Sequence, residues 1–398
     1  MKVSKKEFEL EFFKEKGFIR KQCPKCGAWF WTLNKDQVFC NDAPCIEYTF
    51  YNLDYKAPFL TVSGARRAFI GFFERHGHTP VEPKPVVARW REDLYLTIAS
   101  IVDFQPFVTD GVVPPPANPL VVSQPCIRLE DIDNVGKTAG RHLTSFEMGG
   151  HHAFNYPEKE VYWKDQTVRY HHEFVTKELG VKSEEVIYKE GIWSGGGNAG
   201  PDVESIVRGL EVATLVFMKY KVVGEELVEL PIRTVDTGYG IERFTWLSQG
   251  SISCFHAIYD QILDQIMEIS SIPEVDENLL AEVSKVSGLL DISRMIDRSG
   301  RWRWIAKRVK MSREELDKVL TPITNLFAVA DHTKCLIFML AEGVVPSNVR
   351  EGYLTRLMIR RTYRLLKTLS IEDKLAEIID MQIEYWSKDF PHLKEMGD

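Results

Sequence analysis

The sequence predicts an α+β fold, and two observations carry this prediction. The middle of the chain reads as strands: residues 120–127 and 142–146 flank a polar loop as the arms of a hairpin, and residues 210–220 form a near-continuous apolar, β-branched run. Beyond about residue 250, the periodic segments have helical spacing. We therefore expect a sheet in the centre of the chain and helices in its C-terminal part.

Length and composition indicate an ordinary globular protein. The chain has 398 residues, of which 44% are hydrophobic, and this length suits two or three domains. We place the boundaries so that an N-terminal extension covers residues 1–58, a central domain 59–256 and a helical domain 257–398. The net charge is −7, so contact with nucleic acid requires a local basic surface.

The cysteine count and the apolar runs bear on the compartment. Seven cysteines are present, an odd number, and three of them are isolated in apolar surroundings, which suits a reducing environment. We find no apolar run of membrane-spanning length. We expect a soluble cytoplasmic protein without membrane contact.

Four cysteines near the N-terminus predict a structural zinc site. They form two close pairs on turns, Cys23 with Cys26 and Cys40 with Cys45, as in chains that surround Zn²⁺ with four thiolates. A closed sphere of four ligands indicates a role in folding. The alternatives are reduced cysteines in a small cap and, less favoured, a redox pair.

The hairpin carries residue types that suit a nucleotide. Arg128 and Glu130 follow its outgoing arm, and His142 and Phe146 belong to its returning arm. A guanidinium group can bind phosphate, and an aromatic ring can stack on a base. The alternative is a hairpin with a solvated, charged tip.

The residues on either side of the hairpin predict further elements. A helix with apolar positions at 68, 69, 72 and 73 ends near His76, and residues 161–179 look helical. His171 and His172 in the second helix point to different faces, so we interpret them as structural. Residues 192–201 predict a glycine-rich loop, with Trp193 as a pocket wall or, alternatively, a flexible surface loop.

Two later segments carry charged residues in apolar surroundings. Glu211 lies in the apolar strand 210–220, where a carboxylate needs a cation, either magnesium or an arginine. Residues 235–243 turn from a strand into a helix across two glycines, with Asp236 at the end of the strand and Arg243 in the first helical turn. The glycines would let a ligand lie against the backbone.

The C-terminal part predicts amphipathic helices at 255–271 and 277–298, a capping box from Ser312, a long helix from Pro322 and a helix capped by Ser347 or Asn348. Basic side chains form a stripe on the last of these helices and a second cluster before Ser312. A solvated face is the usual explanation of such a stripe, but on an acidic chain the binding of nucleic-acid phosphates is the favoured interpretation. The stripe consists of Arg356, Arg360, Arg364 and Lys367, and the cluster of Arg301, Arg303, Lys307, Arg308 and Lys310.

These segments together resemble the alanyl-tRNA synthetase family, archaeal type, within the class II aminoacyl-tRNA synthetases. The resemblance spans roughly residues 60–370. Residues 64–90, the hairpin and Gly238–Arg243 are similar to the three class II signatures. FEMGGHH (146–152), LVFMKY (215–220), VDTGYGIER (235–243), ADH (330–332) and VVPSNVREGYLTRLMIRR (344–361) point to alanine.

The resemblance implies an antiparallel class II sheet flanked by helices, a catalytic domain at 59–256 and an incomplete acceptor-stem recognition domain at 257–398. The substrates would be L-alanine, ATP with Mg²⁺, and tRNA(Ala). The implied ATP-binding residues are Arg128, Glu130, Arg141, His142, Phe146, Glu211 and Arg243, with Arg128 and Arg243 catalytic. The implied alanine-binding residues are Arg128, Met148, Trp193, Thr214, Asp236 and Gly238. The implied tRNA-binding residues are Asn348, Arg356, Arg360 and Arg364.

The sequence departs from bacterial-type relatives at two places. The hairpin loop lacks their Gly-Gly-Lys, and Thr214 stands where they have asparagine. We find no editing motif, and we expect either a portion of a longer protein or a natural short form. Two other functions stay open: an adenylating paralogue that loads alanine onto a different acceptor, and a non-catalytic, zinc-containing nucleic-acid-binding module.

Overall fold

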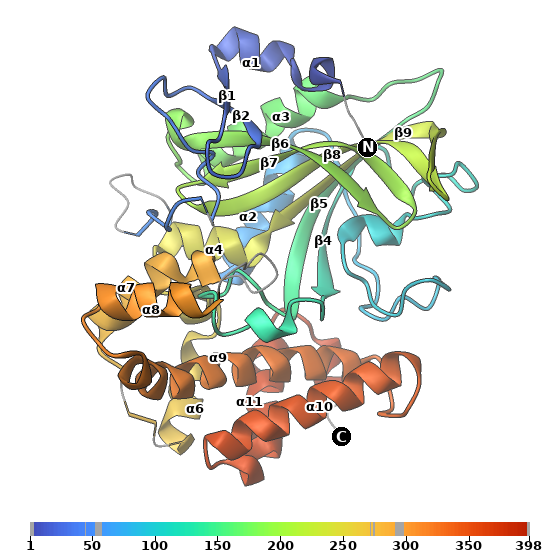
Figure 1. Cartoon of the computed structure of the whole chain (residues 1–398). Coiled ribbons are helices and arrows are strands. Elements are labelled where there is room, and N and C mark those ends of the chain that lie inside the picture. Colours follow the sequence, from blue (N-terminus) through green and yellow to red (C-terminus); the bar gives the residue numbers. More distant parts are fainter. Residues whose placement is uncertain are drawn as a thin grey trace. The chain divides into compact units, whose positions relative to one another are not determined.

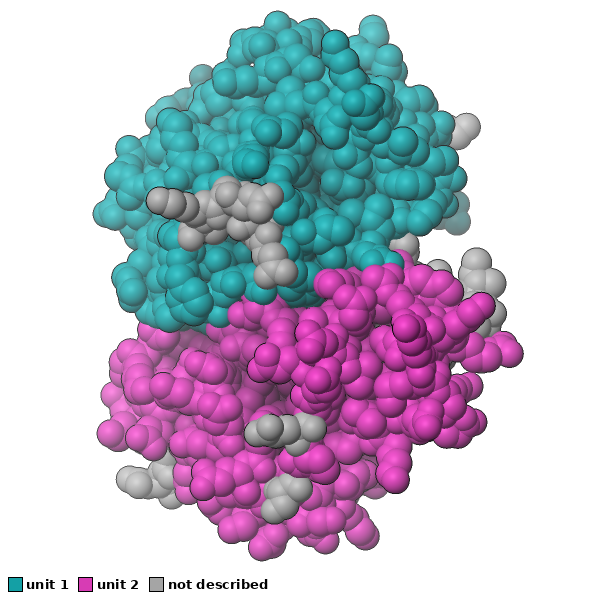
Figure 2. Space-filling view, turned by 90° about the vertical axis from the view of Figure 1, so that its left-hand side faces the viewer, with its two compact units in different colours: residues 1–84, 99–124, 147–250 teal, residues 85–98, 125–146, 251–398 magenta. Residues whose placement is uncertain are grey.

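The chain divides into two compact units (Figure 2). The computed structural model describes residues 4–43, 45–51, 58–270, 272–273, 275–290 and 298–395. Unit 1 comprises residues 1–84, 99–124 and 147–250, and unit 2 comprises residues 85–98, 125–146 and 251–398. The domain boundaries at 58 and 256 stay predictions from the sequence.

A nine-stranded sheet confirms the α+β fold (Figure 1). Its order is β1-β2-β6-β7-β8-β9-β5-β4-β3. Neighbours from β1 to β9 pair antiparallel, as do β9 and β5, whereas β3 and β4 pair parallel. The strands are β1 (Ile19–Gln22), β2 (Trp29–Thr32), β3 (Thr79–Pro80), β4 (Leu120–Ile127), β5 (Ser145–Asn155), β6 (Val186–Gly195), β7 (Asn198–Val207), β8 (Leu210–Val223) and β9 (Glu226–Gly240).

Helices α2 (Val62–Arg75), α3 (Lys164–Glu173) and α4 (Ile241–Gln249) cover one face of the sheet in unit 1. The ring of Tyr239 on β9 lies 4.8 Å from Phe69 of α2, 5.3 Å from His171 of α3 and 5.8 Å from Phe244 of α4, measured between ring centroids. As expected, α2 ends at His76, and Phe69 is buried. His171 and His172 are buried and hydrogen-bonded, to Ser205 and Tyr188 respectively.

The opposite face of the sheet packs on the short helix η2 (Ser100–Asp103). Its core combines Ile101 and Phe104 with Val216 and Met218 of β8, and Trp193 packs against this cluster. Side chains alternate between the two faces along each strand. The polar residues that pair with these core residues across the sheet therefore also lie on this face. The described helical elements of unit 1 that precede α2 are η1 (Lys5–Phe8) and α1 (Glu11–Lys16). The π-turn η4 (Phe174–Glu178) and η5 (Ser183–Glu185) follow α3.

The expected glycine-rich loop at 192–201 is wrong. Residues up to Gly195 belong to β6 and residues from Asn198 belong to β7, so that only Gly196 and Gly197 form the turn, with φ of 57° and 82°. Glycines are tolerated in these strands because neighbouring groups need the space. A Cβ on Gly200 would lie 2.0 Å from the carbonyl oxygen of Phe217, and one on Gly195 would lie 2.6 Å from the Trp193 ring.

The hairpin forms, but its returning arm differs from the expectation. It begins at Ser145 and continues to Asn155, so His142 lies in the loop before β5. The tip is not simply solvated, because Asn134, Val135 and Gly136 are buried. Gly136 has a φ of 81°, and a Cβ on it would lie 2.3 Å from the carbonyl oxygen of Thr324.

Unit 2 is helical beyond residue 250, as expected. Its longest helix, α9, starts at the capping box of Ser312 and Glu315 and continues through Pro322, so the expected start at Pro322 is wrong. We expected no apolar run of membrane-spanning length, but helix α9 is long and apolar enough to cross a membrane. However, 83% of its most apolar window is buried inside the protein. It is therefore the core helix of unit 2. Its neighbour α10 begins after Val349, which offers no side-chain cap, rather than at Ser347 or Asn348.

The helix expected at 255–271 is divided at Tyr259, and the one expected at 277–298 is described only as far as residue 290, because residues 291–297 lie outside the described residues. The elements of unit 2 are η3 (Ile132–Asn134), α5 (Cys254–Ile258), α6 (Asp260–Ser270), α7 (Glu277–Ser287), η6 (Gly288–Leu290), α8 (Arg298–Arg308), α9 (Arg313–Ala341), α10 (Arg350–Thr368), η8 (Glu372–Lys374), α11 (Leu375–Trp386) and α12 (His392–Glu395).

Candidate functional site

A small group of candidate binding residues lies together on unit 1, on the sheet face opposite α2. Strand pairing sets Thr214 against Gly238, and Met148 against Gly240. Directly paired residues present their side chains on the same face, so Thr214, Asp236, Gly238 and Met148 share one face. A Cβ on Gly238 would lie 3.1 Å from the sulfur of Met148. The structure thus brings together four of the residues expected to bind alanine.

Asp236 is a buried carboxylate on this face. Its side chain is 8% exposed, and one carboxylate oxygen lies 3.6 Å from Nδ1 of His152. Burial lowers the pKa of His152 to about 3, so the imidazole is neutral at physiological pH and brings no positive charge to Asp236. A carboxylate in this setting favours a cationic group of a ligand.

Trp193 lies on the same face, further along the sheet. It packs against the core cluster that contains Val216, and Val216 pairs with Asp236. The indole is partly buried, and the cluster that it contacts contains the strand partner of Asp236.

Glu211 meets an arginine, which is one of the two cations that the sequence left open. A terminal nitrogen of Arg243 lies 3.5 Å from the Glu211 carboxylate and donates to the Glu211 carbonyl oxygen at 2.9 Å. Thr214 donates a hydrogen bond to the same carboxylate at 3.0 Å. The close approach depends on Gly240, whose Cβ would lie 3.0 Å from Cδ of Arg243. Glu211 thereby fixes Arg243 at the start of α4.

In unit 2, the hairpin holds Arg128 over an aromatic ring. Nε of Arg128 donates to the carbonyl oxygen of Ile98 at 2.8 Å, and the guanidinium carbon lies 5.2 Å from the centroid of Phe146. Arg128 and Glu130 are both exposed. The remaining guanidinium donors of Arg128 can therefore reach a ligand.

The hairpin loop orders His142 and buries Arg141. Nδ1 of His142 lies 3.0 Å from the Thr138 hydroxyl, and its Nε2 lies 4.0 Å from the Asp131 carboxylate. Arg141 is 6% exposed. Asp131 and His142 thus share one side of the loop, as a weak ion pair when the imidazole is protonated.

A buried carboxylate on α9 fixes the returning arm, which sequence reasoning missed. Asp331 accepts two contacts from the Thr144 amide, at 2.9 and 3.1 Å, and one from its hydroxyl at 2.5 Å. Burial raises the pKa of Asp331 to about 6, against the effect of these hydrogen bonds. The motif ADH at 330–332 contained the residue, but no local signal gives its partner.

Two carboxylates on β7 were also missed. Asp202 pairs with Val216 and Glu204 with Thr214, so both lie on the face that carries Asp236. The pKa of Asp202 is raised to about 8, chiefly because the carboxyl group is buried and to a lesser extent because of the negative charges of Glu204 and Glu211. The alternation of acidic residues at 202 and 204 was the available signal, and it lay next to the segment interpreted as a loop.

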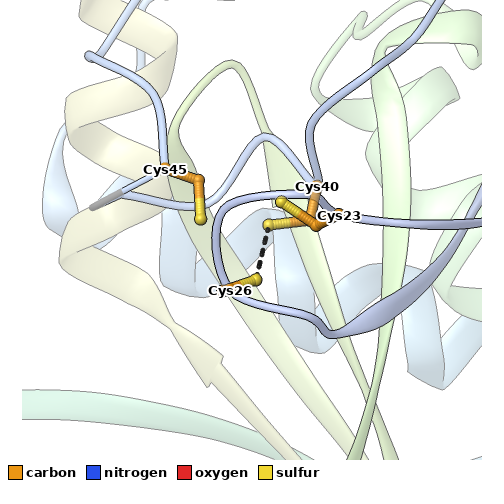
Figure 3. A group of neighbouring side chains, drawn as sticks. All are labelled: Cys23, Cys26, Cys40 and Cys45. Atoms are coloured by element: carbon orange, nitrogen blue, oxygen red, sulfur yellow. Dashed lines mark hydrogen bonds between the residues drawn. The ribbon is translucent and has the colours of Figure 1, made fainter.

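The N-terminal cysteines converge as expected. The four sulfur atoms lie within 4.8 Å of one another, and Cys26 and Cys40 are 3.7 Å apart (Figure 3). A tetrahedral zinc ion with Zn–S bonds of about 2.3 Å places its sulfur ligands about 3.8 Å apart. Burial raises the pKa of Cys45 to about 12, and a cation would oppose that shift. The donor set and its spacing therefore fit zinc.

The basic stripe of α10 faces solvent: Arg356, Arg360, Arg364 and Lys367 are all exposed. Asn348 is exposed as well, and its side-chain oxygen accepts a short hydrogen bond from Arg356. In the second cluster, the Arg301 side chain lies outside the described residues. Arg308 pairs with Glu282 at 3.2 Å, which reduces its availability to phosphate.

The sequence of the chain is similar to known proteins along most of its length. The family "tRNA synthetases class II (A)" matches residues 64–398, and the chain belongs to this family. Within it, the chain is similar to alanine–tRNA ligases. It is 55% identical to that of Hyperthermus butylicus over 98% of this chain and 42% of the relative. It is 51% identical to that of Sulfurisphaera tokodaii over 100% and 44%, and 53% identical to that of Korarchaeum cryptofilum over 98% and 44%.

The chain spans less than half the length of these curated relatives, 42% to 44%. A solved structure, the pyrrolysyl-tRNA synthetase of Desulfitobacterium hafniense, matches 49% of this chain and 72% of that chain at 14% identity with a TM-score of 0.35. At this score the structural match adds nothing to the family assignment.

Proposed function

We propose that the chain activates L-alanine with ATP to alanyl-adenylate and transfers the alanyl group to the 3′ end of tRNA(Ala). The observation that carries the proposal is the buried carboxylate of Asp236 beside Gly238 and Met148, which suits a very small amino acid. The similarity to alanine–tRNA ligases over almost the whole chain supports it.

Asp236 would hold the substrate ammonium group. Met148, Trp193 and Gly238 would enclose the methyl group, and Thr214 would form the polar wall. A longer side chain would meet the Met148 thioether, because this sulfur already lies 3.1 Å from where a Cβ on Gly238 would be. The pocket thus selects by size.

Arg128, Phe146 and Arg243 would bind ATP, with Phe146 and Arg243 on either side of the adenine. Glu130 would approach the exocyclic amine, and Arg141 and His142 would lie towards the pyrophosphate. Glu211 contributes by holding Arg243. As the family resemblance implies, these groups would bind one nucleotide.

The chemistry requires alignment and charge neutralisation. The alanine carboxylate is ionised at neutral pH, so it attacks the α-phosphorus without a general base, and the bond to the bridging oxygen breaks as pyrophosphate leaves. Arg128 would neutralise the charge that develops on the α-phosphate. Magnesium bound with ATP would balance the phosphate charges. A terminal ribose hydroxyl of tRNA then attacks the adenylate carbonyl, and AMP leaves.

The exposed stripe of Arg356, Arg360 and Arg364 would contact phosphates of the acceptor stem. Asn348 would contact a G·U base pair in the minor groove of that stem, as the family resemblance implies. Its bond from Arg356 occupies the amide oxygen, so the amide nitrogen remains as the donor.

Zinc would stabilise the N-terminal extension by closing the four-thiolate site. The cluster packs against Ile187 of β6, and Asp42, between its third and fourth cysteines, pairs with Lys189 at 2.7 Å. Loss of the metal would therefore loosen the edge of the sheet. We place the protein in the cytoplasm.

Amino-acid-dependent exchange of pyrophosphate into ATP tests the proposal. We expect exchange with alanine, and weaker but measurable exchange with glycine and serine, because one methyl or hydroxyl group changes binding by only about 1–3 kcal/mol. Rejection of serine by about five orders of magnitude would contradict the size argument.

The acceptor is tested separately. Exchange without charging of tRNA(Ala) transcripts would indicate an adenylating paralogue with another acceptor. Absence of exchange with any amino acid would leave a non-catalytic nucleic-acid-binding module. Comparing transcripts with and without the G·U pair tests the role of Asn348.

A further inference from the structure

A pocket of about 310 Å³ lies within unit 2, among the hairpin loop, α9 and α10. All of its lining residues belong to this unit: residues 132–137 of the loop, residues 324–332 of α9 and residues 361–365 of α10. Helices α9 and α10 pack along each other (Figure 1). None of the pocket residues except Arg364 has a role in the proposed aminoacylation.

The wall contributed by α9 contains a buried histidine without hydrogen bonds. His332 is 3% exposed, and neither of its ring nitrogens has a partner among the described residues of the protein. Burial, and then the charge of Arg361, lowers the pKa of this imidazole to about 3. At neutral pH it therefore presents one N–H donor and one nitrogen acceptor to the pocket. Buried polar groups are nearly always hydrogen-bonded, so this one indicates a polar occupant.

The charged lining favours an anion. Lys137, Arg361 and Arg364 supply three cations, and Asp133 is the one carboxylate among the residues that line the pocket. Arg361 donates to Asp133 at 2.8 Å, and Lys137 donates to the Asp133 carbonyl oxygen at 2.8 Å. The two arginines have donors beyond these contacts, since a guanidinium group has five N–H bonds. The excess of positive charge matches a dianion, on a chain whose net charge is −7.

The apolar lining favours an organic body attached to the anion. Val135, Ala328 and Leu365 line the same pocket, and the volume exceeds what a bare phosphate ion fills. Arg guanidinium groups bind phosphate oxygens in pairs. We propose that this pocket binds a phosphate monoester with an aromatic or apolar body, its phosphate between Arg361 and Arg364 and a polar atom on His332.

The phosphate monoester has two possible sources, a free small molecule or the 5′-terminal phosphate of an RNA. Arg364 belongs both to the pocket and to the exposed stripe of α10. Successive arginines of the stripe are four residues apart, which is about 6 Å along the helix axis. An RNA bound along the stripe would therefore reach Arg364 and pass the entrance of the pocket. The proposal does not depend on alanine activation, because binding is measured without ATP or alanine.

Calorimetric titration of the full chain with phenyl phosphate at pH 7.5 tests the proposal. We expect saturable binding that Arg364→Met weakens by about tenfold or more, since a charge-assisted contact is lost. Arg350→Met is the matched control: it removes an exposed arginine of the same helix that neither lines the pocket nor belongs to the stripe. It should change the dissociation constant by less than about twofold. Inorganic phosphate should bind more weakly, and phenol should not bind.

A spectroscopic measurement on the wild-type protein locates the bound ligand, and a substitution is needed only to assign the signal. In ¹⁵N-histidine-labelled wild-type protein, saturation with phenyl phosphate should shift the His332 ring signals, assigned with His332→Gln. Absence of saturable binding, an unchanged His332 signal, or an equal loss from Arg350→Met would overturn the proposal.

The RNA arm of the experiment decides between the sources. Displacement of phenyl phosphate by an acceptor-stem hairpin that carries a 5′-monophosphate, and loss of this competition in Arg364→Met, would identify the 5′-terminal phosphate of an RNA. Phenyl phosphate binding that the hairpin does not displace would identify a free phosphate monoester. Either result supports a phosphate site, and failure of the exchange assay would leave both results unaffected.

Discussion

Replacing Asp236 with asparagine is expected to remove most alanine activation and leave the fold intact. The side chain is 8% exposed, and its neighbour His152 is held neutral by burial. The ammonium group of alanine then supplies a positive charge that this imidazole does not. Removal of one partner from a buried charge pair costs about 3–5 kcal/mol. This energy corresponds to a loss of about 10² to 10⁴ in kcat/KM for alanine.

Pyrophosphate exchange as a function of alanine concentration measures this loss, and the concentration dependence on ATP should stay near that of the wild type. Glu229→Gln makes the same chemical change on the same strand at an exposed position, so it controls for loss of charge in β9. Thermal unfolding of both variants checks the fold, and Asp236→Asn should not be destabilised, because burial of a carboxylate is itself unfavourable.

A kcat/KM for alanine within about threefold of the wild type in Asp236→Asn would refute this reasoning, since that ratio corresponds to less than about 0.7 kcal/mol. The ammonium group would then have to bind elsewhere. A parallel loss with Glu229→Gln would show that the charge of the strand, rather than the pocket, is responsible.

Three further changes test separate parts of the structure. Gly238→Ala should lower kcat/KM for alanine more than kcat/KM for glycine, and the difference should correspond to about 1–3 kcal/mol of activation free energy. The reason is that the new Cβ would lie 3.1 Å from the Met148 sulfur. Equal losses for the two amino acids in the exchange assay would contradict this expectation. For Asp202, burial raises the folded-state pKa from 3.8 to about 8, so its contribution to stability is present at low pH and is lost as pH rises towards 8. Relative to Asp202→Asn, the wild type should therefore lose about 2 kcal/mol of unfolding free energy between pH 6 and 8. Urea unfolding measures this free energy, and the same difference between wild type and variant at both pH values would refute the expectation. Removal of metal by a chelator should lower the melting temperature of the wild type, and Cys26→Ser should lower the zinc content measured by atomic absorption; a chain purified without zinc and with an unchanged melting temperature would argue for simple reduced thiols.

Several features were accessible to sequence reasoning because their determinants are local. The two cysteine pairs lie on short turns, and the capping box of Ser312 and Glu315 spans three residues. The strand-to-helix change at Gly240 and the stripe of α10 follow from spacing alone. In each case the interacting groups are close in the chain, so spacing fixes their geometry.

The errors at residues 192–201 and 322 have a common origin. Glycine and proline are read as interruptions when the chain is considered alone. In the sheet, Gly200 leaves space for a neighbouring carbonyl group, and in α9 the proline is carried by a helix whose buried face packs in the core of unit 2. Burial across elements outweighed the local preference.

The tertiary structure alone decided which charged groups meet. The sequence placed Glu211 in an apolar strand and required a cation, but only strand pairing and the start of α4 bring Arg243 to it. The same holds for Asp202, which shares a face with Asp236 through Val216, and for Thr144, which Asp331 binds from 187 residues away. A shift of one residue in the register of a strand turns every side chain to the other face, so partners that are distant in the chain are determined by pairing and packing rather than by spacing.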